Sequence, residues 1–125
     1  MAEMQDERDH HSCGLVTNPA TGEKEIVAVS GDQDNTPTEI YNIEENTWRP
    51  GPPLPDGPSF ARIAQDGRNS FFVLGGRIDS TNPDLFLDTI YRFDEDTYDF
   101  VLLDQRLPYA ANRAFGMMVS QRNLA

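Results

Sequence analysis

The sequence predicts an all-β protein built from two units of four antiparallel strands each. Short runs rich in Val, Ile and Phe alternate with clusters of Gly, Pro, Asn and Asp, a pattern typical of strands joined by tight turns. The two halves of the sequence also match each other, so that the same unit occurs twice. We find no convincing run of apolar residues at the 3.6-residue spacing of an amphipathic helix.

The internal match joins residues 25–55 to residues 70–108. The shift between the two stretches is 50 residues at the centre of the unit, 45 at its glycine and 53 at its closing Leu-Pro. Insertions therefore fall in loops, while the strand-like cores keep their register. The corresponding positions are Gly31 and Gly76, Tyr41 and Tyr91, Thr47 and Thr97, and Trp48 and Tyr98.

In the first unit, strands are expected at residues 13–17, 25–30 and 38–43 and from Trp48 onward. The second of these, EIVAVS, is followed directly by Gly31, which can adopt a positive φ and let the chain turn. The Glu-Glu-Asn-Thr segment before Trp48 is turn material, because Asn bonds its own backbone. A Leu-Pro pair closes the unit, since Pro cannot sit in a central ladder.

In the second unit, strands are expected at residues 60–64, 70–74 and 88–93 and from Tyr98 onward. The turn before Tyr98 reads Asp-Glu-Asp-Thr, and a second Leu-Pro pair closes the unit. The loop over residues 77–87 is five residues longer than its counterpart in the first unit. The two units thus predict the same order of strands.

This arrangement resembles the kelch repeat, a unit of about 50 residues that forms one four-stranded blade of a β-propeller. The family pattern is an apolar strand ending in Gly-Gly, then a Tyr, then a Trp seven positions later, then Leu-Pro. Ser replaces the first Gly in one unit, and Tyr replaces Trp in the other. The resemblance covers about residues 10–120. The positions that carry it are Ser30, Gly31, Tyr41 and Trp48, and Gly75, Gly76, Tyr91 and Tyr98.

The resemblance implies two four-stranded antiparallel blades of an incomplete kelch-type β-propeller. Propellers are closed rings of about four to eight blades, so two blades leave apolar faces open. The chain is therefore expected to be a fragment of a longer protein; assembly of several copies into a ring and an open pair of blades are the alternatives. The implied divisions are a disordered acidic N-terminus at 1–9, repeat 1 at 10–55, repeat 2 at 56–108 and the start of a third repeat at 109–125.

The aromatic marks are expected to pack between sheets rather than to stack on a ligand. Tyr41 and Tyr91 would each lie on one strand, with Trp48 and Tyr98 on the neighbouring strand. Trp48 is the expected main determinant of stability. Its replacement by Ala would cost roughly 3–5 kcal/mol if the side chain is fully buried.

Charge and composition exclude several classes of protein. The formal net charge is −11, and a surface this acidic repels phosphate backbones and anionic lipids, which argues against nucleic-acid or membrane binding. The longest apolar runs are only a few residues, and the polar N-terminus is no signal peptide. The single cysteine, Cys13, cannot form an intramolecular disulfide. A reducing, cytoplasmic location fits these features.

No metal site is expected from the sequence. His10, His11 and Cys13 form the only cluster of soft ligands, whereas a structural zinc site takes four. A calcium loop of the EF-hand type starting at Asp32 would need Gly at its sixth position and Glu at its twelfth, and the sequence has neither.

The expected function is protein binding. No catalytic residue and no cofactor is predicted, and the kelch resemblance implies an interaction module, a substrate adaptor or scaffold that binds partner peptides through a loop face. The alternative is a fragment of a kelch-type propeller enzyme, either a sugar oxidase or a sialic acid epimerase. The catalytic residues of those enzymes cannot be carried over to this chain.

The resemblance implies that the binding face is lined by the loops between the second and third strands and by those between blades. Here these are residues 32–37, 77–87, 55–59 and 108–113. An apolar Leu-Phe pair at 85–86 either contacts a partner or packs against the blade. For the arginines, pairing with carboxylates is favoured over contact with a peptide. The candidate partner-binding residues are Arg62, Arg77, Asp79, Asn82, Asp84 and Arg113.

Overall fold

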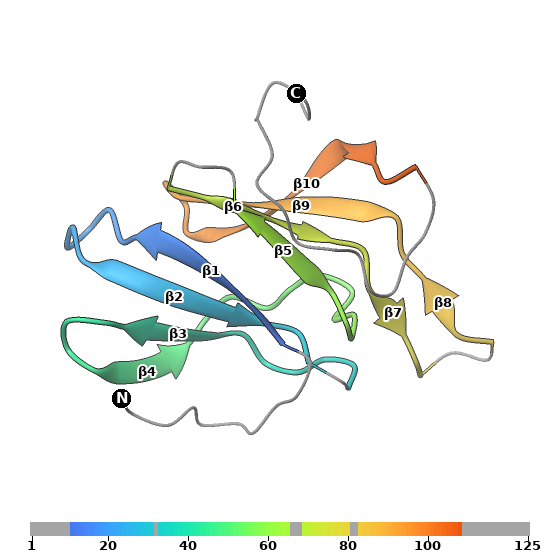
Figure 1. Cartoon of the computed structure of the whole chain (residues 1–125), viewed down its shortest axis with the longest axis horizontal. Coiled ribbons are helices and arrows are strands. Elements are labelled where there is room, and N and C mark those ends of the chain that lie inside the picture. Colours follow the sequence, from blue (N-terminus) through green and yellow to red (C-terminus); the bar gives the residue numbers. More distant parts are fainter. Residues whose placement is uncertain (1–10, 32, 66–68, 81–82, 109–125) are drawn as a thin grey trace.

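The computed structural model describes residues 11–31, 33–65, 69–80 and 83–108, and this part of the chain is all-β without a helix (Figure 1). Eight strands form two antiparallel four-stranded sheets, and two short strands form a separate pair. The prediction of an all-β chain with four-stranded antiparallel units is confirmed, but the sheets of these residues do not close into a ring. Outside the described residues lie the expected acidic N-terminus, 1–9, and the expected start of a third repeat, 109–125.

The first sheet is a simple meander in the order β1-β2-β3-β4. In the turn from β1 to β2, Gly22 has φ +74° and its N–H donates to the carbonyl of Asn18. In the turn from β3 to β4, Asn46 has φ +55°, a left-handed conformation that Asn tolerates better than most residues. The strands are β1 (Ser12–Thr17), β2 (Lys24–Val29), β3 (Glu39–Asn42) and β4 (Thr47–Pro50).

The second sheet repeats this meander in the order β5-β6-β9-β10, with a hairpin inserted between its two central strands. Gly75 (φ +60°) and Gly76 (φ +115°) turn the chain out of β6 and into the hairpin, as expected of glycines at that place. At the corresponding place of the first unit, Ser30 has the positive φ (+62°), and the expected use of Gly31 for this turn is wrong, because Gly31 has no positive φ. The strands are β5 (Arg62–Gln65), β6 (Phe71–Leu74), β7 (Arg77–Ile78), β8 (Leu85–Phe86), β9 (Thr89–Asp94) and β10 (Asp99–Arg106).

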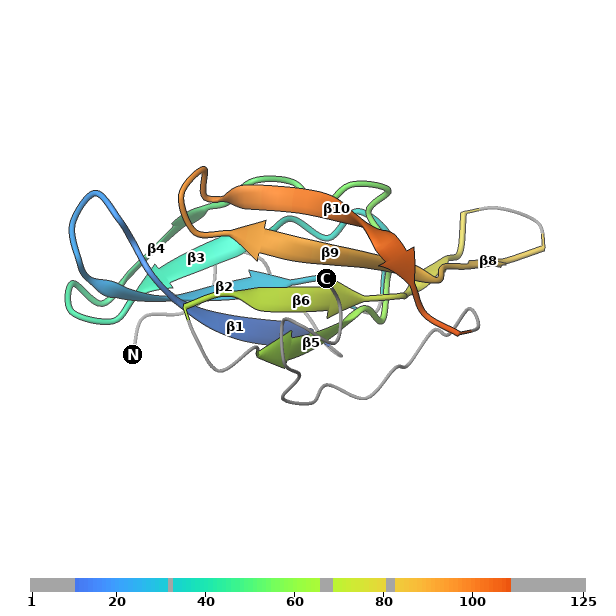
Figure 2. The same ribbon diagram turned by 90° about the horizontal axis from the view of Figure 1, so that it is seen from above.

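The main apolar core lies between the two sheets, where β1 lies beside β5 and β6 (Figure 2). Side chains alternate along β6, so Phe71 and Val73 face the first sheet while Phe72 and Leu74 face the other way, into a second cluster. The members of the main core are Val16, Val27, Val29, Ile40, Leu54, Ala61, Phe71, Val73, Tyr91, Phe93 and Phe100.

The hairpin formed by β9 and β10 is shifted by two residues relative to the sequence alignment. Trp48 on β4 pairs with Tyr41 on β3, and their ring centroids are 5.0 Å apart, as predicted. Tyr98 does not lie on the corresponding strand, because it ends the turn before β10 with φ +57°. The place of the first pair is taken by Phe93 and Phe100, which are also seven residues apart, are paired across the strands and have centroids 5.2 Å apart. The alignment is wrong here because β9 runs two residues further before its turn.

Burial separates the four expected aromatic marks into two groups. Tyr41 and Tyr91 are buried, with 6% and 5% of their surface exposed, which confirms their expected packing. Trp48 and Tyr98 are only half-buried. The condition for a cost of roughly 3–5 kcal/mol at Trp48, complete burial, is therefore not met. Its neighbour across the strands, Tyr41, packs against the ring at a tilt of 42°.

Candidate binding surface

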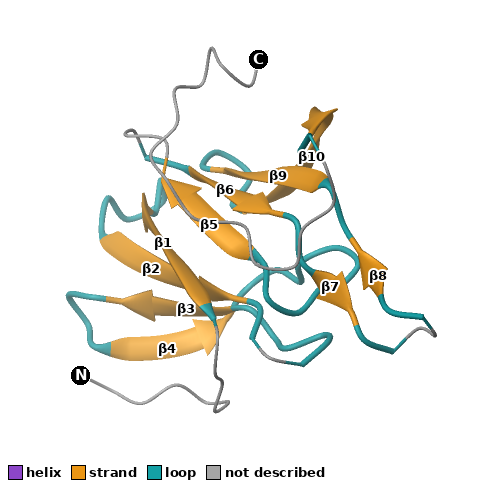
Figure 3. Cartoon of the chain, turned by 45° about the vertical axis from the view of Figure 1, so that its right-hand side comes forward, coloured by secondary structure: helices purple, strands orange, loops and turns teal. Residues whose placement is uncertain are grey.

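Loops from both units meet on one side of the molecule, next to the β7–β8 hairpin that projects from it (Figure 3). Asp34, in the loop after β2, accepts hydrogen bonds from the backbone N–H groups of Asp79 (3.1 Å) and Ser80 (2.7 Å). The N–H of Asn35 donates to the carbonyl of Gly57 (2.8 Å), which lies in the segment connecting β4 to β5. Three loops therefore form one surface. The loop surface is defined as residues 33–37, 55–60, 75–80 and 83–87.

Arg77 is held within the loop surface by two neighbours. Its guanidinium carbon lies 4.7 Å from the centroid of the Phe60 ring. It forms an ion pair with Asp79, in which Nε and Oδ1 are 2.5 Å apart and Nη2 donates to Oδ2 at 3.2 Å. The backbones of Arg77 and Ser59 exchange two hydrogen bonds of 2.8 Å each. The side chain is 25% exposed and is paired with the carboxylate of Asp79, the pairing with a carboxylate that the sequence favoured.

The carboxylate of Asp34 carries a fixed negative charge. Partial burial raises the pKa of Asp34, but the backbone N–H groups of Asp79 and Ser80 donate to the ionised form and lower the pKa below its usual value overall. The charge is therefore retained at neutral pH. It holds the first residues of the turn between β7 and β8 against the loop of the other unit.

Two large apolar side chains on β8 are exposed to solvent. Leu85 and Phe86 expose 51% and 46% of their surface, so about half of each side chain is open to solvent. They pair with Ile78 and Arg77 of β7 in antiparallel register. The hairpin thus presents an apolar pair directly beside the ion pair of the loop surface.

The structure brings some of the predicted binding residues together and places others elsewhere. Arg77, Asp79 and the exposed Asp84 belong to the loop surface. Arg62 begins β5 opposite Leu74, inside the second sheet rather than on the loops. Asn82 and Arg113 lie outside the described residues.

Sequence reasoning missed two members of the loop surface. Asp34 lies in the loop 32–37 that was expected to line the binding face, but neither Asp34 nor Phe60 was singled out as a binding residue. Their partners are distant in sequence: Asp34 bonds the backbone 45 and 46 residues further on. The only local signal is the Asp-x-Asp spacing of an acidic loop, which does not indicate what the carboxylate binds.

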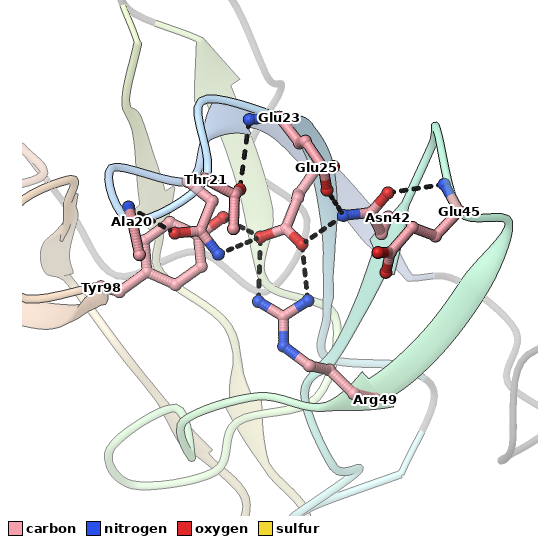
Figure 4. A network of polar contacts seen from close by, with 9 residues as sticks. Ala20, Thr21, Glu23, Glu25, Asn42, Glu45, Arg49 and Tyr98 are labelled. Atoms are coloured by element: carbon pink, nitrogen blue, oxygen red, sulfur yellow. Dashed lines mark hydrogen bonds and ion pairs between the residues drawn. The ribbon is translucent and has the colours of Figure 1, made fainter.

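A second polar cluster lies where the first sheet meets the turn before β10 (Figure 4). Glu25 on β2 is 1% exposed and accepts two hydrogen bonds from Arg49, at 2.5 and 2.9 Å. The hydroxyl of Tyr98 donates to it at 2.5 Å, and the amides of Asn18 and Asn42 donate at 3.2 Å each. Both carboxylate oxygens are therefore fully partnered.

The electrostatics of this cluster suit a structural role. Burial raises the pKa of Glu25, but the hydrogen bonds from Arg49 and Tyr98 and the charge of Arg49 outweigh burial and lower the pKa to about 2. Burial and the bond to Glu25 raise the pKa of Tyr98. A carboxylate this acidic is a poor general base at neutral pH, because catalysis requires a pKa near the working pH.

Neither a metal cluster nor a spanning helix is found in the part of the chain that the structure describes. Its residues contain no group of three or more His, Cys, Asp or Glu side chains that could hold a metal ion. His10, one of the three soft ligands considered above, lies outside the described residues. The same part of the chain has no helix long and apolar enough to cross a membrane.

The comparisons with known proteins leave the family open. The sequence matches no protein-family model, and no curated protein matches it. The kelch resemblance therefore rests on the repeated residues themselves. What is established is an all-β chain with two antiparallel four-stranded sheets in tandem.

Proposed function

We propose that the chain is a protein-interaction module whose two sheets are neighbouring blades of a kelch-type propeller. Three features support this reading: both sheets have the same meander, the first strands of the two lie side by side, and one apolar core joins them. The loops of both units lie on one side, where a partner would meet them together.

The observation that carries the proposal is the coupling of two loops through Asp34. Its bonds to the backbone of Asp79 and Ser80 fix the hairpin that exposes Leu85 and Phe86. Exposed apolar side chains on an ordered loop are characteristic of binding sites, since loops carry function on a rigid scaffold. The expected partner is a peptide with an apolar anchor for β8 and a basic residue for the carboxylates nearby.

Capture of partner proteins by the immobilised chain tests the proposal. Phe86→Ser removes half of the apolar pair, and Ile43→Ser is the matched control, because Ile43 is 45% exposed on the turn after β3. The test is quantitative comparison of captured proteins by mass spectrometry. The captured amount of binding partners should fall at least tenfold with Phe86→Ser and stay unchanged with Ile43→Ser.

A charge reversal, Arg77→Glu, gives a second arm. It breaks the ion pair with Asp79 and the contact with Phe60, so the same partners should bind more weakly. Capture that is unchanged by both loop variants, or reduced equally by Ile43→Ser, would show that the loop surface is not the binding site.

A further inference from the structure

The outer edge of β8 carries backbone groups that point away from the hairpin. Arg77 on β7 exchanges two hydrogen bonds of 2.8 Å with Ser59, so its N–H and carbonyl point away from β8. Phe86 lies directly opposite Arg77. In an antiparallel pair, two facing residues either bond each other or both turn their polar groups outward. The N–H and the carbonyl of Phe86 therefore point away from β7, to the edge of the hairpin.

This edge continues the edge of β9 that β10 covers. β10 pairs with β9, and beyond the end of β10 the N–H of Leu107 donates to the carbonyl of Asp88 at 2.8 Å. Phe86 comes two residues before Asp88, so its outward groups are next in line along the same edge. Among the residues that the structure describes, none bonds to those groups. The edge is therefore paired up to Asp88 and open at Phe86.

Two other sheet edges carry features that hinder pairing with a further strand. The edge of β1 is occupied at Leu15, whose N–H and carbonyl both bond the side-chain amide of Gln65, at 3.1 and 2.8 Å. The edge strand β10 is irregular between Leu102 and Arg106, where its register with β9 shifts. Covered edges and bulges keep a strand from pairing with another chain. In the described part of its hairpin, β8 has neither feature and can serve as a template for an extended chain.

The charge beside Phe86 selects the side chains of a chain that pairs there. Asp84 is exposed and lies two residues before Phe86, so the two side chains fall on one face of an extended segment. On that face, Arg77 is already paired with the carboxylate of Asp79. The formal net charge of −11 also attracts cations to the chain from a distance. An incoming strand with an apolar residue opposite Phe86 and a basic residue two positions away matches both side chains.

We propose that the loop surface binds its partner by strand addition, in which an extended peptide pairs with the edge of β8. The N–H of Phe86 donates to the carbonyl of the apolar peptide residue, and the N–H of that residue donates to the carbonyl of Phe86. The basic residue of the peptide pairs with Asp84. This inference rests on the proposed function and adds the backbone geometry and the sequence pattern of the partner, an apolar and a basic residue separated by one position.

A displayed library of random peptides, selected on the immobilised whole chain, tests the proposal. The enriched peptides should share an apolar and a basic residue separated by one position. Asp84→Lys should weaken their binding at least tenfold, measured by fluorescence anisotropy of the labelled peptide. Asp96→Lys is the matched control, because it changes the net charge equally at an exposed position of the turn between β9 and β10, and it should leave binding unchanged.

The backbone pairing is tested directly on an enriched peptide. Methylation of the amide nitrogen of the apolar residue should abolish binding, whereas methylation of either neighbouring amide should not, because alternate N–H groups of a strand point to the same side. In the complex, the amide proton of Phe86 should exchange with solvent at least tenfold more slowly than in the free chain, as followed by NMR.

The contrary outcomes separate this proposal from the proposed function. Peptides whose binding is lost with Phe86→Ser but survives methylation of each amide would show that the loop surface binds through side chains alone. Strand addition would then be wrong, and the interaction module would stand. Peptides that bind Phe86→Ser as well as the unaltered chain, or the enrichment of no peptide, would overturn both.

Discussion

The hydroxyl of Tyr98 donates a 2.5 Å hydrogen bond to Oε1 of Glu25, a residue 73 positions earlier in the chain (Figure 4). Tyr98 reaches this position from a turn with φ +57°, and its ring also meets Phe93 edge to face at 5.1 Å. The contact joins the second sheet to the buried ion pair of the first. The two sheets are thus held together by a charge-assisted bond as well as by the apolar core.

Removal of that hydroxyl should weaken the chain. Tyr98→Phe leaves a buried carboxylate one donor short, which is expected to lower the free energy of unfolding by about 1–3 kcal/mol. Urea unfolding followed by circular dichroism measures the change. Tyr41→Phe is the matched control, since its hydroxyl bonds the exposed Asn46 in a turn, and it should cost less. Equal costs for the two variants would contradict a specific stabilising role of the hydrogen bond between Tyr98 and Glu25.

Acid should destabilise the chain through Glu25. Its folded-state pKa of about 2 lies below its ordinary value of 4.5, so its contribution to stability is complete above pH 4.5 and is lost as the pH falls toward 2. That contribution is on the order of 3 kcal/mol. The free energy of unfolding, measured in urea at several pH values, should depend less on pH for Glu25→Gln than for the unaltered chain. The exposed Glu45→Gln should keep the original slope.

The stability of the core should depend on Phe93 more than on Trp48. Phe93 is fully buried between three aromatic rings, so Phe93→Ala is expected to cost about 3–5 kcal/mol. Trp48→Ala should cost clearly less, because the ring is only half-buried. Chemical unfolding at a low protein concentration compares the two. A larger cost at Trp48 than at Phe93 would contradict this order.

Gly14 should be intolerant of any side chain. A Cβ at this position of β1 would collide with the ring of Phe71, which packs between the sheets. Gly14→Ala is therefore expected to cost about 1–3 kcal/mol through overpacking. Gly14→Ala should cost less in a Phe71→Leu background than in the unaltered chain, because the smaller side chain leaves room for the added Cβ. A double-mutant cycle by thermal unfolding measures this coupling. Additive costs would exclude the collision.

The sequence was sufficient for the eight strands of the two sheets, but residues 77–87 were expected to be a loop and contain β7 and β8, and the register was not predicted correctly everywhere. Tyr41 and Trp48 form the predicted cross-strand pair, because a short turn after β3 leaves little freedom. In the second unit, both Tyr91 and Phe93 have an aromatic residue seven positions later, so the spacing alone could not select the pair. The structure selects Phe93 and Phe100, since an even shift of two keeps the same face buried.

The candidate site was predictable only in part, for a related reason. Residues 77–87 stood out as a long loop, and Arg77 and Asp79 lie on the loop surface that the structure forms. Asp34 and Phe60 did not stand out, because their role comes from backbone and ring partners in another unit. A local sequence pattern indicates which residues form a turn, but it does not indicate which distant loop that turn will contact.

By itself, the sequence determined that this chain is all-β and that its unit occurs twice. These properties are local, because strand and turn propensities and the positive φ of Gly75 and Gly76 act over a few residues. The tertiary structure decided which faces are covered, how Glu25 is partnered and which loops share a surface. The contacts of Asp34 with Asp79 and of Tyr98 with Glu25 join residues 45 and 73 positions apart, and burial and charge pairing select them only once the sheets have packed.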